Sequence, residues 1–219
     1  MIRLLITISI FSGFAFASDE HLVPVNPLSE YERYVNEKLL GAQRRLYGLV
    51  ERPSFEAENA VYASADFIND DQGELIYNEH DLPKAKAWFL ESVVASENIW
   101  YGEYSSKEKS QKKISVSRSR VTITEQQFWG LQRALYSALA ETRYSNEPTY
   151  IADGTRYTIF SSGRFGSMHS PMAKGKTPYK LTQLYISLKN YIESSGKNKE
   201  SLEYIAGFIS EYDNGHHNQ

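Results

Sequence analysis

Residues 114–139 read ISVSRSRVTITEQQFWGLQRALYSAL, a stretch that passes from a strand pattern directly into a helix pattern. Thr124 is followed three residues later by Gln127, which is the sequence of a capping box and marks the first turn of a helix. Apolar residues then recur at the spacing of one helix face. The predicted buried stripe consists of Phe128, Leu131, Leu135, Ala138 and Leu139.

In the strand half of this stretch, apolar residues occupy even positions at first and odd positions later. Ile114 and Val116 would share one face of a strand, whereas Val121 and Ile123 would share the other. Because side chains alternate between the two faces, we expect a bulge or bend near residues 117–120. Residues 99–104 are the predicted antiparallel partner, joined through a charged, serine-rich segment at residues 105–113.

A second hairpin is predicted at residues 150–157. Asp153-Gly154 is a dipeptide that tolerates the positive φ angles of a type I′ turn. A two-residue turn at this place sets Tyr150 opposite Tyr157 as a cross-strand aromatic pair. The segment that follows, residues 161–176, is polar and glycine-rich, and we expect little regular structure in it.

The first helix of the chain is predicted to begin after Ser29, which forms a capping box with Glu32. We expect it to run to Arg52-Pro53, because the residue before a proline is pushed out of the helical conformation. Its apolar stripe is Tyr31, Val35, Leu39, Ala42, Leu46 and Leu49.

Two more amphipathic helices are predicted near the end of the chain. Thr177-Pro178 opens the first, which ends at Gly196, and Asn198 caps the second. Their buried residues are expected to be Leu181, Leu184, Tyr185, Leu188 and Ile192, and then Leu202, Ile205, Ile209 and Tyr212.

The middle of the chain is less clearly patterned. Residues 57–80 are consistent with two strands, at 60–62 and 75–77, around a turn-like segment at 69–73, and equally with helical pieces. Pro83 is suited to the first turn of a short helix. That helix would carry Ala85, Trp88, Phe89 and Val93.

The order of these elements predicts an α+β fold, in which antiparallel strand pairs pack with three or four amphipathic helices. No repeat or change in composition marks a boundary within the chain. We therefore expect one globular domain at residues 18–213, followed by a frayed tail at residues 214–219.

The first residues have the three parts of a secretory signal peptide. Arg3 supplies the positive charge, residues 4–16 form a short apolar run, and Ala15-Phe16-Ala17 offers a peptidase site. We expect residues 1–17 to be removed during export by the Sec route to a periplasm or the outside. No later stretch approaches the ~20 apolar residues of a membrane span, so a soluble product without a transmembrane segment is expected.

The composition of the chain excludes several kinds of site. With no cysteine, it can form neither a disulfide framework nor a thiolate metal site. A formal net charge of −3 gives no basic excess for nucleic-acid binding. None of the 5 histidines stands in a zinc-binding motif, and the chain has no glycine-rich phosphate loop, so neither metal nor cofactor is expected.

The residues most suggestive of a site lie at 161–171, where hydroxyls, an arginine and a histidine gather among glycines. The candidate binding residues are Arg164, Phe165 and His169, with Tyr150 and Tyr157 of the predicted hairpin. If the protein is an enzyme, the candidates are His169, Ser170 and Arg164. Adjacent serine and histidine residues rarely reach the geometry of a nucleophile and its base, which favours a role in binding.

Two functions agree with this sequence. The first is a non-catalytic module that binds another envelope or secreted protein, as inhibitors and immunity proteins do. An excess of tyrosine, with 16 residues, suits such a surface, because the ring packs while the hydroxyl stays in water. The alternative is an envelope hydrolase that acts on peptidoglycan, lipid or peptide near residues 161–171.

Overall fold

The computed structural model describes residues 21–25, 29–41, 46–104, 113–143, 154–170 and 172–213. The residues of the predicted signal peptide and of the predicted tail lie outside these ranges. Along the chain the elements are α1 (Glu30–Leu40), β1 (Tyr47–Pro53), β2 (Asn59–Phe67), β3 (Ala85–Ala95), the π-helical turn η1 (Trp100–Tyr104), β4 (Val116–Ile123), α2 (Glu125–Ala140), β5 (Thr155–Ser161), β6 (Arg164–His169), α3 (Thr177–Glu193) and α4 (Lys199–Asp213).

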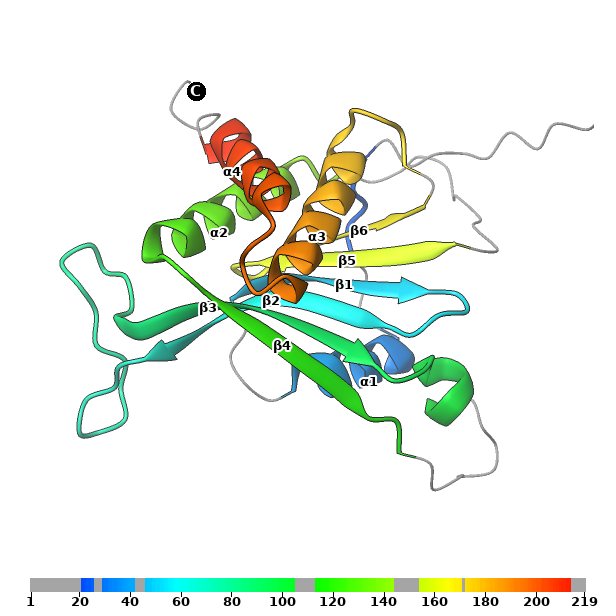
Figure 1. The fold of residues 1–219 in the computed structure, drawn as a ribbon, viewed down its shortest axis with the longest axis horizontal. Coiled ribbons are helices and arrows are strands. Elements are labelled where there is room, and N and C mark those ends of the chain that lie inside the picture. Colours follow the sequence, from blue (N-terminus) through cyan, green and yellow to red (C-terminus); the bar gives the residue numbers. More distant parts are fainter. Residues whose placement is uncertain are drawn as a thin grey trace, which may run out of the picture.

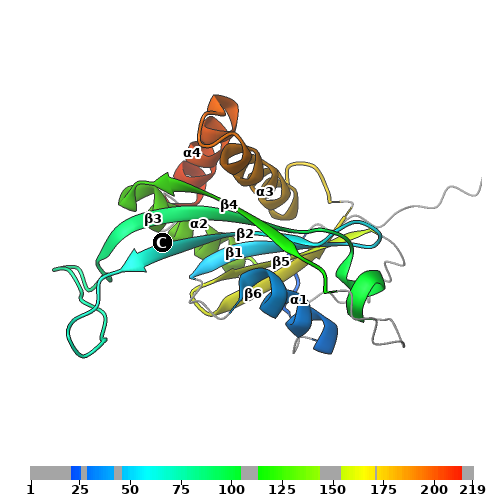
Figure 2. The ribbon, with the colours of Figure 1, turned by 60° about the horizontal axis from the view of Figure 1, so that its bottom comes forward.

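The predicted α+β fold with antiparallel strands is confirmed. Its 6 strands form one sheet in the order β4-β3-β2-β1-β5-β6, and every neighbouring pair is antiparallel. Helices α2, α3 and α4 cover one face of this sheet, and α1 lies against the other (Figures 1 and 2). No helix in the described part of the chain is long and apolar enough to cross a membrane.

The sheet has an apolar core on each face. The larger core lies beneath α2, α3 and α4, and the smaller one lies beneath α1. Side chains of the central strands alternate between them, so that Leu49 enters the larger core and Val50 the smaller. Because both faces are covered, these strands are apolar at consecutive positions.

Strand β4 has no bulge, contrary to the sequence prediction. Its register with β3 runs without a shift from Trp88 opposite Ile123 to Ala95 opposite Val116. Val116 packs against the smaller core and Ile123 belongs to the larger one. Apolar residues therefore occur on both faces of β4 because both faces contact a core, and not because the strand bends.

The partner of β4 was predicted wrongly. Residues 100–104 form the helical turn η1, and the strand beside β4 is β3, where a short helix had been expected. The run from Trp88 to Leu90 is buried, and the side chains of β3 reach both cores. Consecutive apolar residues in β3 are therefore explained by a strand that is covered on both faces, without a helix.

Helix α1 begins as predicted but ends much earlier. The capping box of Ser29 and Glu32 is present, yet the helix stops at Gly41, whose φ of 67° leaves the helical region. Leu49, predicted to extend the helical stripe, instead lies in β1. Its spacing from Leu46 fits a helix, but the side chain fills the larger core from a strand.

The predicted hairpin at 150–157 is only partly described, because residues 150–153 lie outside the described ranges. Strand β5 pairs with β1 on one edge and with β6 on the other, and Tyr157 lies between Glu51 and Met168. Residues 161–176 were expected to have little regular structure, but residues 164–169 form β6. Gly163, with a φ of 80°, allows the tight turn between β5 and β6.

The other predicted helices are confirmed. Helix α2 has the capping box of Thr124 and Gln127 and buries the predicted stripe. Helix α3 is followed by Gly196 at a φ of 80°, and Asn198 accepts a hydrogen bond from the Ser201 amide at the start of α4.

The strand alternative for residues 60–62 is also confirmed, since they lie within β2. Leu75 and Tyr77 form isolated bridges with Asn69 and Pro83 rather than a full strand. In the intervening turn, the Asp70 carboxylate accepts hydrogen bonds from two backbone amides. These residues form the arm that projects from one end of the sheet (Figure 1).

Candidate functional site

A pocket of about 410 Å³ lies where the start of α1, the end of β1, the start of β5 and the turn η1 meet. Ser54 joins two of these segments, because its hydroxyl donates to the Gly154 carbonyl and accepts from the Gly154 amide. Asn98 joins η1 to the segment after β1, since its side chain donates to the Glu56 carbonyl and accepts from the Tyr101 amide. The pocket is therefore held by segments far apart in the sequence.

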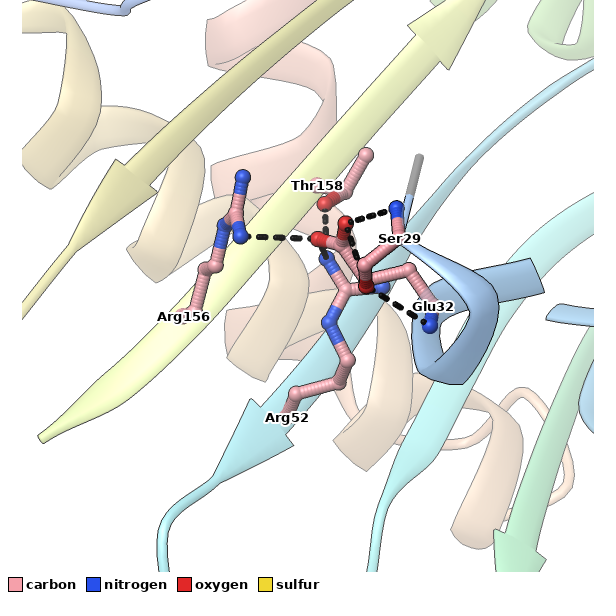
Figure 3. Close-up of polar contacts among 5 residues, drawn as sticks. All are labelled: Ser29, Glu32, Arg52, Arg156 and Thr158. Carbon is pink, nitrogen blue, oxygen red and sulfur yellow. Dashed lines mark hydrogen bonds and ion pairs between the residues drawn. The ribbon is translucent and has the colours of Figure 1, made fainter. Parts of the chain in front are cut away.

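Charged residues Glu32, Arg52 and Arg156 line this pocket, and we call them its floor. Figure 3 shows the polar contacts among them. Glu32 Oε1 accepts from Arg52 Nη2 at 3.1 Å and from Arg156 Nη1 at 2.8 Å. The other oxygen, Oε2, accepts from the amide and the hydroxyl of Ser29. The capping box that starts α1 thus also provides the carboxylate that joins two arginines.

The two arginines face each other across neighbouring strands, since Arg52 of β1 pairs with Arg156 of β5. Their side chains differ in exposure, at 5% for Arg52 and 35% for Arg156. Arg52 also donates to the Thr158 hydroxyl. Its Nη1 atom and the Nε atom of Arg156 are buried and have no hydrogen-bond partner within the described residues.

The cluster shifts the pKa values of its members. Burial raises the pKa of Glu32, but hydrogen bonds from Ser29 and the charges of Arg156 and Arg52 outweigh it and hold the pKa below its ordinary value. Burial lowers the pKa of Arg52, an effect that the Glu32 charge opposes. The Glu32 carboxylate is therefore ionised in the folded protein near neutral pH.

Aromatic side chains form the rim of the pocket. Phe55 and Tyr101 stack with their ring centres 6.4 Å apart, and Trp100 meets Tyr31 edge to face at 4.9 Å. Phe55 is 69% exposed, Tyr101 57% and Trp100 40%. We call these three residues the aromatic rim.

The base of the rim is fixed by Glu58, a carboxylate that is fully buried. It accepts from the Tyr31 hydroxyl and, at 2.7 Å, from the Ile99 amide at the start of η1. Burial first, and then the Glu58 carboxylate, raise the pKa of Tyr31. The Tyr31 hydroxyl is thus held protonated as a donor, and α1 and η1 share one buried acceptor.

The sequence-predicted site residues are spread over the molecule. His169 lines the pocket. Arg164, at the other end of β6, lies over the Tyr136 ring at 3.8 Å. Phe165 is 50% exposed and stacks on Phe160.

The remaining candidates do not add to the pocket. The Ser170 hydroxyl accepts a hydrogen bond from the Thr155 amide, and the Ser170 amide donates to the Thr155 carbonyl. Tyr157 is buried and donates to the Glu51 carboxylate at 2.8 Å. Tyr150 lies outside the described residues.

Most pocket residues were missed by the sequence analysis. Glu32 was recognised as a capping residue but not as the partner of two arginines. Arg52 and Phe55 flank a proline that had been read as a helix end, and Trp100 had been placed in a strand. No short motif links Arg52 to Arg156, because the contact depends on the register of β1 with β5.

Two serine hydroxyls line the pocket, and both are held by other groups of the protein. The Ser29 hydroxyl donates to the Glu32 carboxylate, and the Ser54 hydroxyl donates to the Gly154 carbonyl. Within the described part of the chain, no group of three or more histidine or carboxylate side chains could hold a metal ion. Comparisons with protein-family models, with curated proteins and with solved structures found no match to this chain.

Proposed function

We propose that this protein is a non-catalytic binding module that recognises another protein through the aromatic rim of its pocket. The observation that carries the proposal is the gathering of three exposed aromatic side chains, Phe55, Trp100 and Tyr101, around one concave site. Large aromatic residues beside a pocket are the usual anchors of protein interfaces.

The physical support comes from exposure and rigidity together. An aromatic ring in water retains an unfavourable hydration free energy that burial against a partner would remove. The rim is also preorganised, because Asn98 fixes η1 and Phe55 stacks on Tyr101. Little conformational entropy would then be lost on binding.

A hydrolase centred on residues 161–171 has less support. Strand β6 is extended, so Arg164 and His169 are separated by about 17 Å along the strand. Ser170, the candidate nucleophile, uses its hydroxyl to accept from the Thr155 amide. A catalytic pair would need His169 within hydrogen-bond reach of a free hydroxyl.

The predicted signal peptide supports a partner in the same exported compartment. An inhibitor or immunity protein would bind an exported enzyme there and block it. The pocket and rim are of a size that fits a protruding segment of such an enzyme, since sites of this volume take a few side chains.

The proposal is tested with a double variant of the rim, Phe55→Ala with Tyr101→Ala. Wild-type and variant proteins are immobilised and exposed to the envelope and secreted fractions of the source organism, and the captured proteins are quantified by mass spectrometry. Tyr77→Ala is the matched control, because Tyr77 is also 51% exposed but lies on the projecting arm.

We expect one partner to be captured by the wild type and by Tyr77→Ala but lost from the rim variant. With that partner purified, the rim variant should bind at least about 30-fold more weakly, which corresponds to about 2 kcal/mol. Equal capture by all three proteins, or a loss with Tyr77→Ala instead, would contradict the proposal.

A further inference from the structure

We infer that the pocket binds a carboxylate of its partner, with the Arg156 guanidinium as the group that receives it. This inference rests on the proposed function and names the chemistry of the partner segment. It depends on the charges of the floor and on the exposure of Arg156, whereas the proposed function depends on the aromatic rim.

The positive charges of the floor exceed the negative charge that lines it. Arg52 and Arg156 both donate to the same atom, Glu32 Oε1, and Glu32 is the one carboxylate among the described lining residues. Behind the pocket wall, Glu58 also acts on the charge of Arg52. Arg156 is therefore the less fully neutralised of the two arginines.

Arg156 is also the arginine that a ligand can reach. Its side chain is 35% exposed, against 5% for Arg52. One of its donors is committed to Glu32, and the planar guanidinium has five N–H groups. Because Nε is buried, a carboxylate that entered the pocket would accept from the Nη atoms of Arg156, and such charge-assisted hydrogen bonds are about twice as strong as neutral ones.

The size of the charge excess favours a carboxylate over a phosphate. Among the residues that line the pocket, a single carboxylate would balance the second arginine, whereas a phosphate would bring nearly two negative charges beside Glu32. The aromatic rim adds a second requirement, because Phe55 and Tyr101 offer ring faces next to the charged floor. The segment that fits is an acidic residue followed by an aromatic or apolar one.

The test uses two blocked dipeptides that differ in one charge, N-acetyl-Glu-Phe-amide and N-acetyl-Gln-Phe-amide. Each is titrated into the ¹⁵N-labelled protein in a buffer free of phosphate and carboxylates, and backbone amide and arginine Nε–H signals are followed by NMR. The same titrations are made with Arg156→Gln and with Arg164→Gln. Arg164 is the matched control, since it is an exposed arginine at the far end of β6.

We expect the acidic peptide to shift the signals of Arg156 and Gly154 and to bind at least about fivefold more tightly than the neutral one. Arg156→Gln should remove this difference, and Arg164→Gln should keep it. The comparison of the two peptides on the wild type does not depend on how well any variant folds.

Three results would overturn the inference. These are equal affinities of the two peptides for the wild type, no binding of either peptide, and tighter binding of inorganic phosphate than of the acidic peptide. If a partner is nevertheless lost from the rim variant, the proposed function stands and only the carboxylate chemistry fails. If capture is also unchanged by the rim variant, both fail.

Discussion

Glu32 has two functions in this structure, because it completes the cap of α1 and joins Arg52 to Arg156. Its carboxylate is buried, so replacing it by a neutral side chain leaves the arginines without their shared counter-charge. We expect Glu32→Gln to lower the free energy of unfolding by about 3 kcal/mol, measured by urea denaturation. The control is Glu211→Gln, which breaks an exposed ion pair with Lys180 and should cost about 1 kcal/mol or less.

The same residue should make stability depend on pH. Burial opposes its ionisation, but Ser29 and the two arginines hold its pKa in the folded protein below the ordinary value of 4.5. Its contribution is therefore complete above about pH 4.5 and is lost as the pH falls through the lower, folded-state pKa. We expect the stability difference between wild type and Glu32→Gln to shrink below about pH 4.5. A difference that stays constant down to about pH 3 would contradict this assignment.

At the scale of the element, strand β1 depends on a glycine at the centre of the sheet. A β-carbon on Gly48 would lie 2.7 Å from the Tyr62 β-carbon and 2.7 Å from the Val61 carbonyl oxygen. We expect Gly48→Ala to lower the free energy of unfolding by about 1–3 kcal/mol, since β1 and β2 must move apart.

Gly207 provides the opposite case within α4. A β-carbon there meets nothing within 4 Å, so Gly207→Ala should raise the free energy of unfolding by about 0.5–1 kcal/mol. Both variants are compared by urea denaturation with the wild type. If both variants changed the free energy of unfolding in the same direction, the close approach of β1 to β2 would not explain the glycine at position 48.

The elements that the sequence predicted best are those with local signals. The capping boxes at Ser29 and Thr124 and the stripes of α2, α3 and α4 depend on residues within a few turns of one another. Strand β3 was misread because a strand covered on both faces has no alternation to distinguish it from a helix. The early end of α1 at Gly41 was hidden by leucines whose spacing suits a helix equally well.

At the scale of the whole molecule, the site could not be read from the sequence. Its residues come from segments near positions 30, 53, 100 and 155, and only the sheet register and the docking of α1 bring them together. Among the predicted candidates that the structure describes, His169 alone lines the pocket. Ion pairs between residues far apart in the chain leave no periodic pattern in the sequence. The sequence therefore did not indicate that Arg52 and Arg156 lie side by side.

Residues a few positions beyond the predicted cleavage site take part in the fold. Leu22 is 1% exposed, and its carbonyl accepts from the Arg143 amide. Val23 exchanges two backbone hydrogen bonds with Ser167 on the outer edge of β6. A signal peptidase that cuts after Ala17 would leave these contacts intact, whereas a cut a few residues later would remove them.

This relation predicts how far the chain can be shortened. A protein that begins at Ser18 should unfold at the same urea concentration as one that retains residues 1–17, because Leu22 is the first buried apolar residue of the described part of the chain. A protein that begins at Pro24 should lose at least about 2 kcal/mol, since it lacks a buried leucine and exposes the edge of β6. The intact mass of the exported protein should then correspond to cleavage after Ala17. Cleavage beyond Leu22 would refute the proposed leader boundary. Equal stability of the chain from Pro24 would show that Leu22 and Val23 do not stabilise the fold.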